Sequence, residues 1–301
     1  MKGQTTVEGN GHRDTIVRLA QVVPERRVNA SLRAAYVLSG AIAVLMIASS
    51  ALGLFVHGLY RDTAWGREAV RGGDLVTLVV VVPLLIATLI FAVRGSARAQ
   101  PVLLGLLVYS AYNYAYYVFG AAFNDVFLLH IALFSASVFG LACALAGVDT
   151  EAIRSRLRAD TAARWIGAML VVVGALQGLL WGVLIVRYAV TGELLHDIPV
   201  AGQHLVFALD LGLLMPTLVL AGILLFRRTA FGYTLGAAMA LMGAAYQLNL
   251  MAGGVFQANA DVPGTKAFPP EGILLTALFV VAAAILLWPR KEVPALQPPV
   301  T

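Results

Sequence analysis

The stretch Leu75–Val93 reads LVTLVVVVPLLIATLIFAV and contains no charged side chain. At about 1.5 Å of rise per residue, a helix of this length crosses the hydrocarbon core of a bilayer, which is about 30 Å thick. Similar apolar stretches recur on both sides of it along the chain. They predict eight transmembrane helices, at Ala34–Val56, Leu75–Val93, Val102–Phe123, Val126–Ala146, Ile166–Val186, Leu205–Phe226, Phe231–Met251 and Gly272–Pro289.

The composition favours the same class of protein. Hydrophobic residues make up 60% of the chain and charged residues 12%, whereas soluble domains carry about 25% charged residues. No stretch alternates apolar and polar residues as a membrane β-strand does. Because a helix satisfies its backbone hydrogen bonds within one segment, we predict an all-α fold, namely a polytopic membrane helix bundle. Its predicted partner is the lipid bilayer that surrounds it.

The basic residues predict the orientation. With a cytoplasmic N-terminus, sixteen of the 21 Lys and Arg residues fall in cytoplasmic segments and five fall outside. Positive residues gather on the cytoplasmic side of membrane proteins, so both termini are predicted to be cytoplasmic. Loops that face anionic lipid then explain the net charge of +5, and nucleic-acid binding is not expected. The excess of Arg over Lys, eighteen to three, favours a bacterial plasma membrane.

The two halves of the chain share a pattern. Matching residues lie 133 or 134 positions apart through most of each half: Pro83 and Pro216, Arg94 and Arg227, Tyr112 and Tyr246, Asn113 and Gln247. In the last helix of each half the separation is 145, because a longer loop precedes the eighth helix. We therefore predict a tandem 4+4 repeat whose halves cross the membrane in the same direction, related by an axis along its normal. A site between the halves would place Asn113 near Gln247.

The predicted organisation is a polar tail, two repeats joined by a linker, and a second tail. The ranges are a basic cytoplasmic tail at 1–33, a first repeat at 34–147, a basic linker at 148–164, a second repeat at 165–289 and a tail at 290–301. The largest outer loops are predicted near Arg61–Gly73 and Gln257–Pro270. Gly174, Gly178 and Gly182 share a four-residue spacing that allows close helix packing. Whether this seam lies inside the monomer, in a homo-oligomer or in a membrane complex stays open.

Polar residues within the spans are concentrated towards the predicted outer face. Asp210 lies 17 residues from Arg227, and Asn113 lies 15 residues from Arg98, which places both roughly 20–28 Å above the cytoplasmic boundary. The inner halves of the spans are almost wholly apolar. We therefore predict an outward-facing polar pocket with an apolar floor. The candidate ligand-binding residues are Asp210, Asn113, Gln247, Asn249, Tyr112, His130 and Gln177.

Asp210 is the most informative of these candidates. A carboxylate in the hydrocarbon region costs at least about 2.5 kcal/mol on insertion scales, so it is expected to face the bundle or water and to find a partner. It could anchor a ligand or exchange a proton, or it could hold helices together by hydrogen bonds. The duplication aligns Asp210 with Thr77 and His130 with Leu275. Each ionisable group therefore occurs in one half only, which favours a functional role over a structural one.

A metal site is not predicted. The groups considered are His57, His130, His196, His204, Asp125 and Asp210, all of them assigned to the outer side. No pair of the histidines shows the i, i+4 spacing that would place two metal ligands on one helix face. A single histidine near a helix end is more often a structural residue than a ligand.

Several chemistries are excluded by the sequence. Cys143 is the only cysteine, so thiol-disulfide oxidoreductases, which need a paired cysteine, and metal sites with two or four cysteines are ruled out. Phosphate-binding loops, dinucleotide fingerprints and zinc-protease or hydrolase motifs are missing. The spans hold no lysine that could carry retinal. No cofactor is predicted.

Three functions remain. The favoured one is a non-enzymatic protein that binds or moves a small amphipathic or lipid-like molecule in the outer half of the bilayer. Binding is favoured over transport of a polar solute, because the apolar inner half offers no polar path. The first alternative is a membrane enzyme that uses Asp210 and His130 as an acid and base pair, which requires hydrogen-bond proximity. The second is an accessory or scaffold subunit in which Asp210 only stabilises the bundle.

Overall fold

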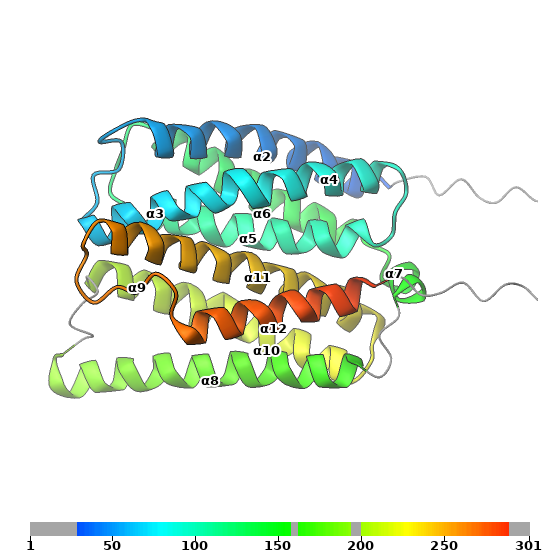
Figure 1. Ribbon diagram of the computed structural model, residues 1–301. Helices are drawn as coiled ribbons and strands as arrows, with labels where there is room; N and C mark the ends of the chain where they lie inside the picture. Colours follow the sequence, from blue (N-terminus) through cyan, green and yellow to red (C-terminus); the bar gives the residue numbers. More distant parts are fainter. Residues whose placement is uncertain (1–28, 158–161, 194–199, 289–301) are drawn as a thin grey trace, which may run out of the picture.

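The computed structural model describes residues 29–157, 162–193 and 200–288. Within these ranges, the long elements are helices that lie side by side (Figure 1). Most of the two predicted tails, four residues of the predicted linker, and His196 lie outside the described residues.

Eight helical stretches of the described residues are long and apolar enough to cross a membrane, which confirms the predicted number and the all-α class. The chain is a multi-pass membrane protein. Two of the eight crossings contain a π-helical turn. The crossings are α2 (Ala30–Phe55), α3–η1–α4 (Ala64–Val76, Thr77–Val81, Val82–Val93), α5 (Ala99–Phe119), α6 (Phe127–Gly147), α8 (Ala162–Thr191), α9–η2–α10 (Val200–Leu209, Asp210–Leu214, Met215–Phe226), α11 (Ala230–Asn259) and α12 (Pro270–Leu287). The short helix α7 (Thr150–Arg156) precedes α8.

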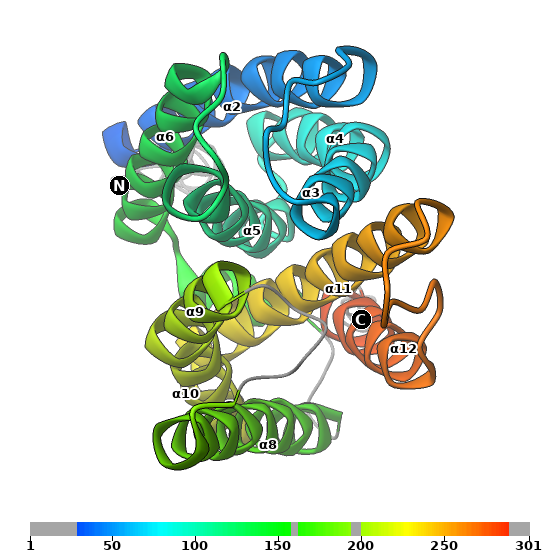
Figure 2. The same cartoon turned by 90° about the vertical axis from the view of Figure 1, so that its left-hand side faces the viewer.

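We name the two ends of the bundle after residues in their loops. The Arg61 end carries loops 56–63, 120–126 and 260–269, and the Arg94 end carries loops 94–98 and 227–229 together with α7. Figure 1 shows the Arg61 end on the left, and Figure 2 looks directly onto it. The sequence predicts that the Arg61 end faces the outside.

Two predicted loops at the Arg61 end are shorter than expected. Helix α3 begins at Ala64, so most of the predicted loop Arg61–Gly73 is helical. The Thr63 side chain accepts a hydrogen bond from the Gly66 amide and caps the helix. Helix α11 likewise continues to Asn259. Hydropathy underestimated both helices, because polar residues near a bundle end can be satisfied by neighbouring helices without ending the helix.

The π-helical turns occupy corresponding places. The Val82 amide bonds to the Thr77 carbonyl, and the Met215 amide bonds to the Asp210 carbonyl, five residues back in both cases. A proline follows directly, Pro83 in one helix and Pro216 in the other. Proline has no amide hydrogen and its ring crowds the carbonyl four residues earlier, so a wider turn at this point relieves the clash. This recurrence agrees with the predicted duplication, which stays a prediction.

The halves differ in how their outer helices pack. In the first half, α2 packs along α6, and α5 also packs along α6. In the second half, α8 packs along α10 and α11 packs along α12, but α8 and α12 touch only marginally. In Figure 2, α8 and α12 lie apart, and α11 runs diagonally between the helices of the first half and the other helices of the second half. Helix α11 contacts both α3 and α5 and so joins the halves.

Glycines permit the closest helix contacts. A Cβ atom on Gly72 of α3 would collide with the backbone of Gly253 on α11, and Gly167 of α8 and Gly222 of α10 approach each other in the same way. Of the predicted glycine seam, Gly174 packs tightly on α10, whereas Gly182 has no neighbour within 4 Å of an added Cβ among the described residues. The seam is therefore an intramolecular contact of α8 with α10 at its Gly174 end.

Candidate functional site: a cavity beside Asp210

A cavity of about 400 Å³ lies where α8 and α12 diverge. Side chains from α8, α10, α11 and α12 line it, and Trp65 of α3 and the loop 263–266 border it at the Arg61 end. Its volume falls within the range of small-molecule sites, about 300–1,000 Å³. Its deepest residues towards the Arg94 end are apolar, namely Val173, Leu218 and Phe279.

Asp210 is held at the wall of this cavity by two neutral donors. The Tyr112 hydroxyl donates to Oδ1 at 2.6 Å, and the Trp181 indole Nε1 donates to Oδ2 at 2.8 Å. The residue is 2% exposed. Because the indole N–H can only donate, its contact places partial positive charge against the carboxylate. Asp210 opens the π-helical turn η2, and Trp181 comes from α8, so this bond adds a polar link to the packing of α8 along α10.

The aromatic and amide groups around Asp210 come from both halves. Tyr112 and Tyr246, which the predicted duplication pairs, meet edge to face with ring centroids 5.1 Å apart, and their hydroxyls lie 3.3 Å apart. Gln177 and Gln247 line the cavity together with Tyr246 and Asp210. Neither glutamine side chain is hydrogen-bonded to another described residue. Both amides are therefore available to a molecule in the cavity.

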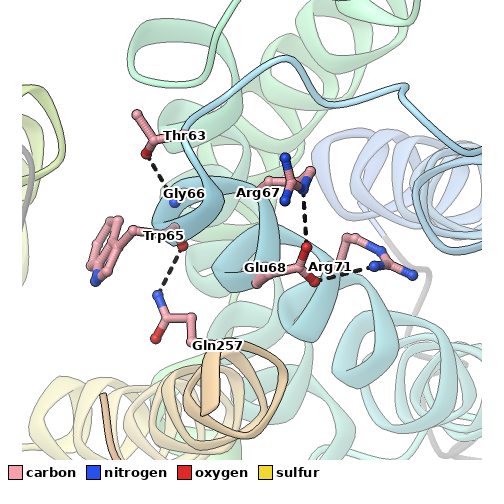
Figure 3. A network of polar contacts seen from close by, with 7 residues as sticks. All are labelled: Thr63, Trp65, Gly66, Arg67, Glu68, Arg71 and Gln257. Carbon is pink, nitrogen blue, oxygen red and sulfur yellow. Dashed lines mark hydrogen bonds and ion pairs between the residues drawn. The ribbon is translucent and has the colours of Figure 1, made fainter. Parts of the chain in front are cut away.

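A polar network fixes the rim of the cavity at the Arg61 end (Figure 3). The Gln257 side chain of α11 donates to the Trp65 carbonyl oxygen at 2.9 Å, which ties α3 to α11. On the other side of α3, Glu68 accepts from Arg67 at 3.0 Å and from Arg71 at 3.1 Å. Figure 3 shows the Trp65 ring pointing away from these arginines. Of the residues in this network, Trp65 and Gln257 line the cavity.

Asn113 and Asn249 form a second polar group, between the halves. The Asn249 amide donates to Asn113 Oδ1 at 3.0 Å and to the Tyr109 hydroxyl at 2.9 Å. The Tyr109 hydroxyl lies 3.2 Å from the Thr77 hydroxyl. Asn113 is thus paired with Asn249 of the second half, while Gln247, two residues earlier on α11, lines the cavity beside Asp210. The alignment pairs Asn113 with Gln247, but the rotation of α11 brings Asn249 to the contact.

His130 lies in a different part of the bundle. It is fully buried in the first half, with its ring centroid 4.8 Å from that of Tyr117 and 6.2 Å from that of Tyr114. Neither ring nitrogen has a hydrogen-bond partner among the described residues. Asp210 has Tyr112 and Trp181 as its partners. The structure therefore does not bring together the acid and base pair that the enzyme alternative requires.

Sequence reasoning missed a second buried aspartate. Asp74 of α3 is 1% exposed and accepts hydrogen bonds from Tyr60 at 2.6 Å and from Tyr117 at 3.1 Å. A Cβ atom on Gly53 of α2 would overlap both the Asp74 carboxylate and the Tyr60 hydroxyl. Asp74 falls between the predicted outer loop, which ends at Gly73, and the predicted span, which begins at Leu75, so it is not among the predicted site residues. Its position one helical turn before Thr77, the residue aligned with Asp210, could have revealed it.

Trp181 was also missed. It follows Gln177 by four residues and therefore lies on the same face of α8, and this spacing could have identified it. Its side chain packs against Phe207 of α9, with ring centroids 4.9 Å apart.

No protein-family model matches the chain, and neither a curated protein nor a solved structure matches it.

Proposed function

We propose that the protein binds a small amphipathic, lipid-like molecule in the cavity beside Asp210. The single observation that carries the proposal is the composition of this cavity. Apolar side chains form its deep part, and a held carboxylate with two available amides lies nearer the Arg61 end. A ligand with a polar head and an apolar body satisfies both surfaces at once, which a purely polar solute or a purely apolar one does not.

The spread of α8 and α12 supports entry from the bilayer. These helices touch only marginally beside the cavity, and α8 presents apolar side chains such as Leu176 and Leu179 outward. An amphipathic molecule dissolved in one leaflet could therefore enter sideways without crossing a polar barrier. With the predicted orientation, this is the outer leaflet of a bacterial plasma membrane.

The membrane-enzyme alternative lacks the proximity that it needs, because His130 and Asp210 belong to separate clusters. The accessory-subunit alternative makes a distinct prediction, in which changes inside the cavity affect stability alone. The two remaining functions are therefore separated by asking whether the cavity holds a molecule.

The test uses two tryptophan substitutions at similarly exposed leucines. Leu250 lines the cavity and is 51% exposed, whereas Leu220 faces outward on α10 and is 50% exposed. Leu250→Trp should fill the cavity mouth, and Leu220→Trp should add the same bulk elsewhere. The full-length proteins are gently extracted and analysed by native mass spectrometry. We expect a bound molecule on the wild type and on Leu220→Trp, but not on Leu250→Trp.

Equal occupancy of both variants would overturn the proposal, because the molecule would then bind elsewhere. A wild-type protein without any bound molecule, and with no affinity for added single-chain amphiphiles, would overturn it too and would favour the accessory-subunit function.

A further inference from the structure

The charges around the cavity carry information about the head group of its ligand, and this inference rests on the proposed function. The charged lining residues are Asp210, Lys266 and Glu271. Lys266 and Glu271 are exposed near the Arg61 end, where solvent screens them and their charges oppose each other. Asp210 is buried at the cavity wall. The inside of the cavity therefore carries a single negative group.

Asp210 differs from Glu68 in its partners and from Asp74 in its surroundings. Glu68, which is 6% exposed, is bonded to Arg67 and Arg71. Asp74 is enclosed by phenol groups and Gly53, with no space left beside it. Asp210 receives two neutral donors, has no cationic partner among the described residues, and borders open volume. A buried charge without a counter-charge is costly, and a ligand cation would supply the missing one.

The aromatic rings at the cavity favour the same charge. Trp181 and Tyr246 line the cavity together with Asp210. Trp65 lines it nearer the Arg61 end, and Phe279 lines it nearer the Arg94 end. The faces of aromatic rings attract cations by about 0.5–2 kcal/mol, depending on how fully water is excluded. An anionic head group would be repelled by the charge of Asp210.

The free amides distinguish between kinds of cation. Gln177 and Gln247 each offer a carbonyl oxygen that is not bonded to another described residue. A protonated amine has N–H donors for these oxygens as well as for Asp210, whereas a quaternary ammonium has none. We propose that the ligand is an amphiphile with a protonated amine head, bound to Asp210 and the two glutamines, with its apolar chain against Val173, Leu218 and Phe279.

The test compares four probes that have alkyl chains of similar length and different heads: octylamine, octanol, octanoate and octyltrimethylammonium. Their dissociation constants are measured at pH 7 with the full-length protein in a nonionic detergent, by thermal shift and by native mass spectrometry. We expect octylamine to bind at least tenfold more tightly than octanol, and octanoate to bind more weakly than both. Octyltrimethylammonium is expected to fall between octylamine and octanol.

Three variants locate the effect. Asp210→Asn should remove the preference for octylamine over octanol, while Glu271→Gln, which removes a negative charge at the exposed mouth, should change it less than threefold. Asp210→Glu keeps the charge and should keep the preference. It therefore remains informative if Asp210→Asn folds poorly.

The outcomes separate this inference from the proposed function. Equal binding of octylamine and octanol, lost in Leu250→Trp, would overturn the amine inference and leave the cavity as an amphiphile site. Tighter binding of octanoate would overturn it as well and would point to Lys266. If no probe binds in a manner that Leu250→Trp abolishes, the proposed function itself fails.

Discussion

Asp74 and Asp210 are both buried, and both accept two hydrogen bonds from aromatic side chains, yet Asp74 is sealed and Asp210 borders a cavity. In the first half, α2 packs along α6 and Gly53 lets the chain close over Asp74. In the second half, α8 and α12 diverge, and the space beside Asp210 stays open. The packing of the outer helices, and not the chemistry of the carboxylate, therefore decides which aspartate a ligand can reach.

The largest expected effect concerns the closure over Asp74. Gly53→Ala places a methyl group on the Asp74 carboxylate and the Tyr60 hydroxyl, so we expect a loss of about 3 kcal/mol in unfolding free energy, as for severe overpacking. Gly182→Ala has no neighbour to meet among the described residues and should be neutral or slightly stabilising. Thermal unfolding in detergent measures both. Equal stability of the two variants would show that the Asp74 cluster is not closed.

The next effect compares removal of each charge. Asp74→Asn puts an amide against two hydroxyls in a sealed space, and we expect about 2 kcal/mol of destabilisation. For Asp210→Asn we expect less than about 1 kcal/mol in the absence of ligand, because the cavity allows water or a rotated amide to restore the bonds. Chemical denaturation of both variants gives the difference. The opposite ranking would contradict the contrast between sealed and open sites.

Removal of one donor from each carboxylate should give a smaller difference in the same direction. Tyr60→Phe deletes the 2.6 Å bond to Asp74, and Trp181→Phe deletes the 2.8 Å bond to Asp210. We expect about 1.5 kcal/mol for Tyr60→Phe and about half of that for Trp181→Phe. Thermal unfolding at one pH and detergent concentration compares them. A larger loss for Trp181→Phe would mean that the indole bond, and not packing, keeps α8 in place.

The smallest expected effect is a dependence on alkaline pH. Burial, and next the charge of Asp74, raises the pKa of Tyr60 above its ordinary value of 10.0. Folding therefore favours the protonated phenol, which stabilises the protein fully below pH 10 and progressively less as the pH rises above it. The loss of stability between pH 10 and 11 should be shallower in Tyr60→Phe than in the wild type. Identical slopes would show that Tyr60 titrates normally.

The sequence predicts how far along the helices the candidate residues lie, but it does not predict which of their side chains contact one another. Asp210, Gln177, Gln247 and Tyr112 meet at or beside one cavity, as their similar distances along the helices from the basic residues at the Arg94 end suggested. His130 belongs elsewhere, and Asn113 pairs with Asn249. Distance along a helix fixes depth, because the rise per residue is constant. The direction in which a side chain faces also depends on how the helix is rotated against its neighbours, which no single span records.

The sequence by itself determined that this chain crosses a membrane as eight helices, because apolar length and internal backbone hydrogen bonding leave few other solutions in lipid. It also placed both prolines, which go with the π-helical turns beside Thr77 and Asp210. Only the tertiary structure decided that α2 and α6 close one half while α8 and α12 leave the other open. Helix association in a bilayer depends on the fit of whole surfaces, and that fit arises between segments far apart in the chain.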